Sequence, residues 1–296
     1  MIYLFVSIIF TSFIYIIFRA FSRFNVDPMP AIVFNYLARV IIGFFIEPQS
    51  FFTYVHKAPP VLLMLCVFTG VAFIAIFSLI SRATRIMGVT STTIVSRMSM
   101  VIPAGFSIIY YHESLGLMKV VGILMALIAI YFTVYEKKIE EIKEKKSKVN
   151  KTALLVPIFL FLGSGLADML LKISQKEFMM NKLDYVYIDI LYSVSALTGI
   201  IVLIVTRTSL KTIFRRQNLI WGIILGADNY IALLLFLLAL TKGNMQGSQV
   251  FPINSVGIVL FSTLFAIIFY KEKLKGHRIL GLALAVCAIL IISLSA

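Results

Sequence analysis

The chain is a succession of long apolar runs separated by short polar connections. A helix needs about 20 apolar residues to cross a hydrocarbon core about 30 Å thick. Open sheets cannot replace such helices, because their edges leave backbone groups unpaired in lipid. The pattern therefore predicts an all-α membrane protein with ten transmembrane helices, over 2–20, 30–47, 60–81, 87–110, 117–135, 152–174, 186–206, 218–240, 247–270 and 278–295.

One charged stretch divides these helices five and five. It covers 136–151, EKKIEEIKEKKSKVNK, and its Glu–Lys pairs at i,i+4 indicate a solvated, partly helical linker. We therefore expect a first five-helix repeat over 1–135 and a second over 152–296.

The last two predicted helices of each half match each other at an offset of 159 residues. A Tyr-x-Glu-x-Leu frame, followed by Gly after six further residues, occurs in both halves without a gap. An odd number of crossings reverses direction, so the second repeat is inverted, which is typical of transporters. The matching pairs are Gly88 and Gly247, Ser96 and Ser255, Phe106 and Phe265, Tyr111 and Tyr270, Glu113 and Glu272, Leu115 and Leu274, Gly122 and Gly281, and Ala126 and Ala285. The recurring glutamates favour a structural capping role.

The same motifs support a resemblance to a known family. The segments 110–130 (YYHESLGLMKVVGILMALIAI) and 269–289 (FYKEKLKGHRILGLALAVCAI) each contain Glu-x-Leu, then a basic residue, then Gly at the next helix. The segments 243–267 and 170–174 (LLKIS) are also similar to that family. The chain thus resembles the drug/metabolite transporter superfamily in its ten-helix, EamA-like form. The resemblance implies two inverted five-helix repeats and transport, and it does not specify a substrate.

Composition excludes several classes of protein. Of 296 residues, 60% are hydrophobic and 14% are charged, whereas a soluble domain is about half apolar and a quarter charged. A soluble enzyme, a disordered protein and a secreted disulfide scaffold are therefore excluded. Cys66 and Cys287 lie in apolar runs, and the three histidines lack metal-binding spacing. We expect no metal and no cofactor.

The net charge of +14 indicates membrane topology and contacts with lipid headgroups. The basic residues lie mostly in short connections, so we expect no nucleic-acid partner. Connections on one side hold 19 Lys and Arg, and those on the other side hold 6. The positive-inside rule places the 136–151 linker in the cytoplasm and both termini outside, in a multi-pass protein of the cell (inner) membrane. Many members of the superfamily are thought to have both termini inside; we follow the charge count.

Three charged residues fall near the middle of predicted helices: Arg39, Arg97 and Asp228. Each costs about 2.5–3.5 kcal/mol if it faces lipid, so we expect them to face the interior. They line a substrate path or form an internal salt bridge between Asp228 and one arginine. We favour the substrate path, because one aspartate cannot neutralise two arginines.

Arg97 is the leading candidate for substrate binding. Thr92, Ser96, Ser99 and Pro103 form a stripe on one helical face beside it. Hydroxyls and a guanidinium suit a carboxylate or a phosphate. The alternative for the hydroxyls is helix–helix packing.

Further candidates lie on other predicted helices. Gln249 and Asn254 flank Pro252, which frees a backbone carbonyl. Asn35 shares a face with Arg39 at i,i+4. For each set the alternative is structural, a tolerated kink in one case and a local contact in the other.

The acidic candidates concern ion coupling. Asp228, followed by Asn229, is a plausible proton carrier. Asp168 is a second candidate for ion coupling, for which a local pair with Lys172 is the alternative. Asp189 opens a predicted helix, where an anion is favoured.

These features together predict a secondary active transporter for a small polar metabolite, anionic or zwitterionic, working by alternating access. Proton or sodium is the expected coupling ion, and the protein is a monomer or a homodimer. The alternatives are a flippase or exporter of a lipid-linked or drug-like amphipathic substrate, and a non-transporting membrane scaffold. We expect no enzyme, since no nucleophile–base arrangement or phosphate loop is found.

Overall fold

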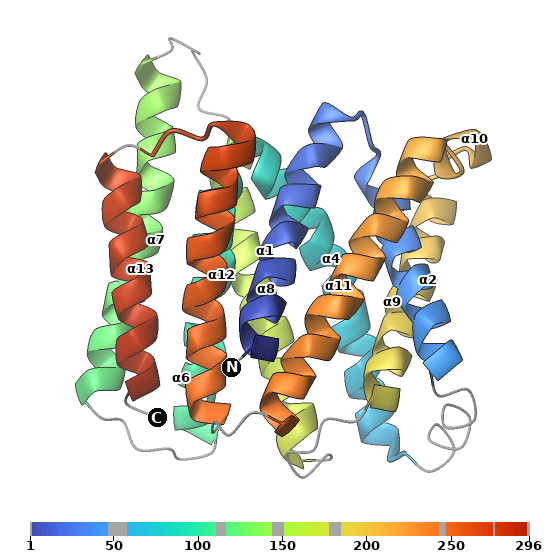
Figure 1. Ribbon diagram of the computed structural model, residues 1–296, viewed down its shortest axis with the longest axis horizontal. Coiled ribbons are helices and arrows are strands. Elements are labelled where there is room, and N and C mark those ends of the chain that lie inside the picture. The colour runs from blue at the N-terminus through green and yellow to red at the C-terminus, as the bar shows by residue number, and fades with distance from the viewer. Residues whose placement is uncertain are drawn as a thin grey trace. The chain divides into compact units, whose positions relative to one another are not determined.

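The computed structural model describes residues 2–46, 58–110, 117–143, 151–177, 185–242, 247–274 and 276–294. Within these ranges all regular structure is helical and no strand occurs. Six of the described helices are long and apolar enough to cross a membrane: α1 (Ile2–Arg23), α2 (Pro28–Ile46), α4 (Pro60–Met87), α8 (Lys151–Glu177), α11 (Arg216–Lys242) and α12 (Gly247–Tyr270). The others are α5 (Val89–Met98), α6 (Val101–Tyr110), α7 (Leu117–Lys143), α9 (Tyr185–Val205), α10 (Leu210–Ile213) and α13 (Gly276–Leu294) (Figure 1). The prediction of an all-α membrane protein is confirmed at this level.

The predicted helix over 87–110 is wrong as a continuous element. It consists of α5 and α6, which are separated at Ser99 and Met100. Pro103 explains the break, because it has no N–H for the Ser99 carbonyl and its ring clashes with that carbonyl. The amide of Ile102 donates to the Ser99 carbonyl instead, at 2.9 Å. Arg97 consequently lies in the last turn of α5, next to the break.

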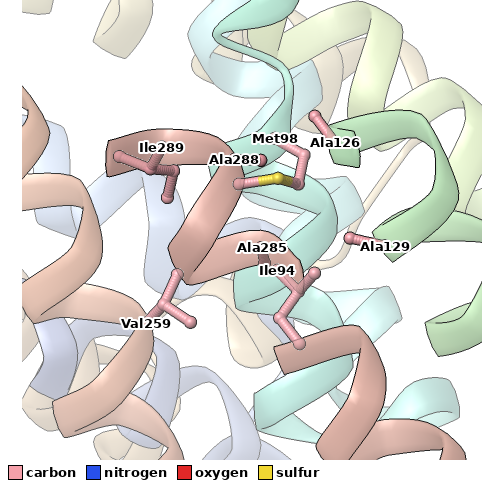
Figure 2. Packing of buried hydrophobic residues seen from close by; sticks show 8 residues of the cluster. All are labelled: Ile94, Met98, Ala126, Ala129, Val259, Ala285, Ala288 and Ile289. Atoms are coloured by element: carbon pink, nitrogen blue, oxygen red, sulfur yellow. The ribbon is translucent and has the colours of Figure 1, made fainter. Parts of the chain in front are cut away.

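The chain forms two compact units. The first comprises Met1–Arg19, Leu79–Gly165 and Ile231–Ala296. In this first compact unit α7 lies beside α13, and both contact α5 (Figure 1). Their shared core is built around alanines, which let helices approach closely. Figure 2 shows its eight fully buried members: Ile94, Met98, Ala126, Ala129, Val259, Ala285, Ala288 and Ile289.

Charged side chains cap two helix ends in the first compact unit. The Glu272 carboxylate accepts a hydrogen bond from the amide of Val89 at 3.1 Å and so caps the start of α5. The sequence predicted a capping role for Glu272. The helix that it caps is α5, and not α13, which follows Glu272 in the chain. At the end of α4, Arg19 Nη1 donates to the carbonyls of Thr84 and Arg85, at 2.7 and 2.8 Å. The negative charge of Glu272 therefore lies at the N-terminus of α5, and the positive charge of Arg19 lies at the C-terminus of α4, as the helix dipole favours.

The second compact unit comprises Ala20–Ser78 and Leu166–Tyr230, and α2 packs against α9 within it. Two glycines, Gly222 and Gly226, bring α11 close to α2. A Cβ added at Gly222 would lie 2.5 Å from the Cβ of Phe34, and one at Gly226 would lie 2.8 Å from the carbonyl oxygen of Asn35. This spacing of small residues is typical of close helix pairs in membranes.

A polar clip holds the start of α2 in the second compact unit. Asn218 Oδ1 accepts from the amide of Asp27 at 2.8 Å, and Asn218 Nδ2 donates to Asp27 Oδ2 and to the Thr212 carbonyl, at 3.2 and 2.7 Å. Arg215 lies 3.9 Å from the same carboxylate. The clip ties Asp27, the residue before α2, to the first turn of α11 and to α10.

Candidate functional site

The second compact unit contains a fully buried arginine. Arg39 on α2 is 1% exposed, and its Cζ lies 3.4 Å from the centroid of the Tyr192 ring on α9. Its Nε and Nη2 atoms have no hydrogen-bond partner among the described residues. A cation–π contact is worth about 2 kcal/mol when desolvated, whereas burying an ion costs several kcal/mol. The aromatic contact alone does not compensate for the burial of this charge.

A network of aromatic rings extends from Tyr192, the ring that covers Arg39. The Tyr36 ring lies 5.7 Å from Tyr192 and 5.5 Å from Phe77, and Phe73 lies 6.1 Å from Tyr192. The Tyr36 hydroxyl is also buried without a partner among the described residues. Three unsatisfied donors therefore lie in a low-dielectric setting, where each retains a high affinity for an acceptor.

One turn before this arginine lies a pair of amides, and a buried carboxyl precedes one of them in the chain. Asn35 and Arg39 lie one turn apart on α2, and Asn229 Nδ2 of α11 donates to Asn35 Oδ1 at 3.5 Å. Asn35 Nδ2 and Asp228 Oδ2 are buried and lack partners in the described part of the chain. Asp228 makes no ion pair with either candidate arginine. The internal salt bridge that was the structural alternative is therefore absent from the described residues.

Asp189 belongs to the same helix interface, which the sequence did not indicate. It is the fifth residue of α9, and its carboxylate lies directly on Gly43 of α2. A Cβ at Gly43 would overlap that carboxylate. Gly43 lies one turn beyond Arg39, so glycine here makes room for a second charged group near the buried guanidinium.

The first compact unit contains a second set of predicted residues. The Tyr15 hydroxyl donates to Ser96 Oγ at 3.3 Å, and Ser96 Oγ lies 3.4 Å from Ser164 Oγ on α8. Arg97 Nε and Asn254 Oδ1 are buried atoms without partners in the described chain. This set is a weaker candidate, because Arg97 itself is only half-buried.

Part of the predicted hydroxyl stripe serves the backbone. Thr92 Oγ1 donates to the Gly88 carbonyl at 2.6 Å, and Ser99 Oγ donates to the Ser96 carbonyl at 2.6 Å. Hydroxyls bonded in this way within their own helix cannot donate to a ligand in this conformation, although their oxygens can still accept. The binding stripe beside Arg97 stays a prediction, in which Thr92 and Ser99 would contribute acceptor oxygens.

The remaining candidate residues differ in the exposure of their side chains and in whether the structure describes them. Asp168 on α8 has an exposed side chain, in contrast to the buried Asp228. Gln249 lies in α12, and its side chain is outside the described residues, as is the whole of Glu113. The described part of the chain contains no cluster of His, Cys, Asp or Glu that could hold a metal ion.

The structure thus separates the predicted site residues into two groups. Asn35, Arg39, Asp228 and Asn229 belong to the second compact unit, and Thr92, Ser96, Arg97 and Asn254 belong to the first. Sequence reasoning missed Tyr36 and Tyr192, and it placed Asp189 at a helix start, whereas α9 begins at Tyr185. An available signal was a tyrosine three residues before an intramembrane arginine on the same helix.

Comparisons with known proteins show that the fold occurs elsewhere, and they do not indicate a function. No family model matches the chain. A Haemophilus influenzae protein described as uncharacterized is 24% identical over 272 residues, which cover 90% of this chain and 88% of that protein. A solved structure, described only as the crystal structure of a protein, superposes with a TM-score of 0.58 at 13% identity over 98% of both chains. At that identity the likeness concerns the fold alone, and it spans nearly the whole chain.

Proposed function

We propose that the chain is a secondary active transporter of the drug/metabolite transporter type, which moves a small polar metabolite across the cell membrane by alternating access. The observation that carries this proposal is Arg39, a fully buried guanidinium with unsatisfied donors on a membrane-spanning helix. An unpaired intramembrane charge is costly to keep and is typical of a substrate path. An anionic or zwitterionic solute would supply the missing acceptor.

The division of the chain into two units supports the proposed inverted repeat. Under the repeat, α5 with α6 corresponds to α12, α7 to α13, and α2 to α9. Both members of each pair lie in the same compact unit. Four helices, α1, α4, α8 and α11, run from one unit into the other. Transporters with inverted repeats commonly work by rocking of one bundle against another.

Ion coupling and orientation complete the proposal. Asp228 is the proposed proton carrier, because it is a buried carboxyl without an ion-pair partner among the described residues. The ten helical segments each cross the membrane, with the linker in the cytoplasm and both termini outside. A reporter fused after Ala296 is expected to give a non-cytoplasmic signal, and a cytoplasmic signal would contradict the charge count.

The test is solute flux into proteoliposomes, measured with labelled organic acids, amino acids and phosphate. Arg39→Gln is expected to lower uptake of the transported solute at least tenfold while the protein still inserts and elutes as a single species. Arg82→Gln is the matched control, because Arg82 is an exposed arginine on α4. Equal flux through both variants would assign Arg39 to the scaffold. Absence of flux for every solute in wild type would favour a flippase or a non-transporting scaffold.

A further inference from the structure

The unsatisfied atoms of Arg39 define one edge of its guanidinium. Nε–H and the neighbouring Nη2–H point in the same direction, which is the arrangement that binds two oxygens of one carboxylate side by side. Both atoms are buried without a partner in the described chain. The Tyr192 ring covers the face of the group at 3.4 Å and leaves the edge as the available donor surface.

The charges around this edge favour a ligand with a single negative charge. Arg39 supplies the positive charge of this site, and the Asp189 carboxylate contacts Gly43, one turn beyond Arg39 on α2. Tyr36 and Tyr192 are the other titratable groups facing Arg39. A dianion would need further cations to offset its desolvation. A monoanion requires only the guanidinium.

The surroundings also favour an organic ligand over an inorganic one. The Tyr192 ring covers the guanidinium, and the rings of Tyr36 and Phe73 extend this apolar surface away from it. Burial of apolar area against such rings contributes about 25 cal/mol per Å². The Tyr36 hydroxyl offers a further donor for a polar group on the ligand.

We infer that Arg39 binds a small organic monocarboxylate, whose two oxygens accept hydrogen bonds from Nε and Nη2 and whose apolar part lies against the aromatic rings. The inference rests on the proposed function, since it names the substrate class of the same site. It replaces Arg97 as the principal anion anchor with a residue whose donors are fully buried.

The test is equilibrium binding to the full chain in lipid nanodiscs, followed by ligand-induced thermal stabilisation. Benzoate is compared with benzamide, which has the same shape and lacks the charge, and with inorganic phosphate and tetraethylammonium. Benzoate is expected to bind wild type at least tenfold more tightly than benzamide or phosphate. Equal binding of benzoate and benzamide, or preference for phosphate or the cation, would overturn the inference without recourse to any variant.

Substitutions then assign the effect to the guanidinium edge. Arg39→Lys keeps the charge and loses the paired donors, so benzoate affinity is expected to fall about 10- to 100-fold. Arg82→Lys is the matched control and should leave affinity unchanged. Unaltered benzoate binding by Arg39→Lys would refute the bidentate arrangement.

Binding and flux separate the two proposals. Benzoate binding that depends on Arg39, without flux of any solute, would leave the carboxylate site in place and refute transport. Flux that depends on Arg39, with preference for phosphate or a cation in the binding assay, would leave transport in place and refute the carboxylate class.

Discussion

Gly226→Ala tests the close approach of α2 and α11 that places Asn35 beside Asn229. A methyl group at Gly226 would lie 2.8 Å from the Asn35 carbonyl oxygen and 2.9 Å from the Cβ of Ala38. Ordinary contacts between carbon atoms lie at about 3.5–4.0 Å. The atoms in the way are backbone and Cβ atoms of a packed helix, so the two helices must separate by several tenths of an ångström.

Two effects of opposite sign determine the magnitude. Overpacking costs about 1–3 kcal/mol, while replacing glycine by alanine within a helix gains up to about 1 kcal/mol. Gly105→Ala isolates the second effect, because a Cβ at Gly105 of α6 meets nothing within 4 Å. The difference in stability between the two variants is therefore the overpacking cost itself, about 1–3 kcal/mol.

The assay uses the one tryptophan of the chain as a local reporter. Trp221 lies on α11, five residues before Gly226, with its ring 4.9 Å from that of Phe24. Thermal unfolding followed by its fluorescence should give a midpoint for Gly226→Ala on the order of 2–10 °C below that of Gly105→Ala. Coincident midpoints would refute the close contact of α2 with α11 and the position of Asn35 that depends on it.

Three further outcomes are expected. Glu272→Gln should lower the free energy of unfolding by about 1 kcal/mol, because a neutral amide caps α5 less well than a carboxylate; an unchanged denaturation midpoint would deny the capping role. Asn218→Ala removes the acceptor of the Asp27 amide and should speed hydrogen exchange there, which mass spectrometry of the 24–30 peptide would detect or exclude. Asp228→Asn should retain downhill flux and lose its response to an imposed pH gradient, and a retained response would assign proton coupling elsewhere.

Apolar run length located the helices, because a membrane imposes a minimum length that few other features can mimic. The break between α5 and α6 was harder to predict. Pro103 is evident in the sequence, but prolines are often tolerated as kinks in membrane helices. Here the clash falls on Ser99, four residues earlier, where Ser99 Oγ bonds the Ser96 carbonyl and stabilises the interrupted turn.

The site was predictable only in part. Arg39, Asn35 and Asp228 were selected as candidates because charged and amide groups in apolar runs are costly. Tyr192 could not be paired with Arg39 from the sequence, since the two are separated by most of the chain and no local pattern joins them. The glycines at 222 and 226 did provide a signal for close packing. That signal identifies a contact face and does not identify α2 as the partner.

The contact between Arg39 and Tyr192 also has a consequence for how the protein is made. Tyr192 is synthesised about 150 residues after Arg39. At about 5–20 residues per second, α2 waits on the order of ten seconds or more before α9 exists. During that interval the guanidinium lacks the aromatic cover of Tyr192, and α2 carries the insertion penalty of an intramembrane charge. Biogenesis of this protein is therefore expected to be slowest at α2, and chains that end before α9 should expose a charged helix that membrane quality control can recognise.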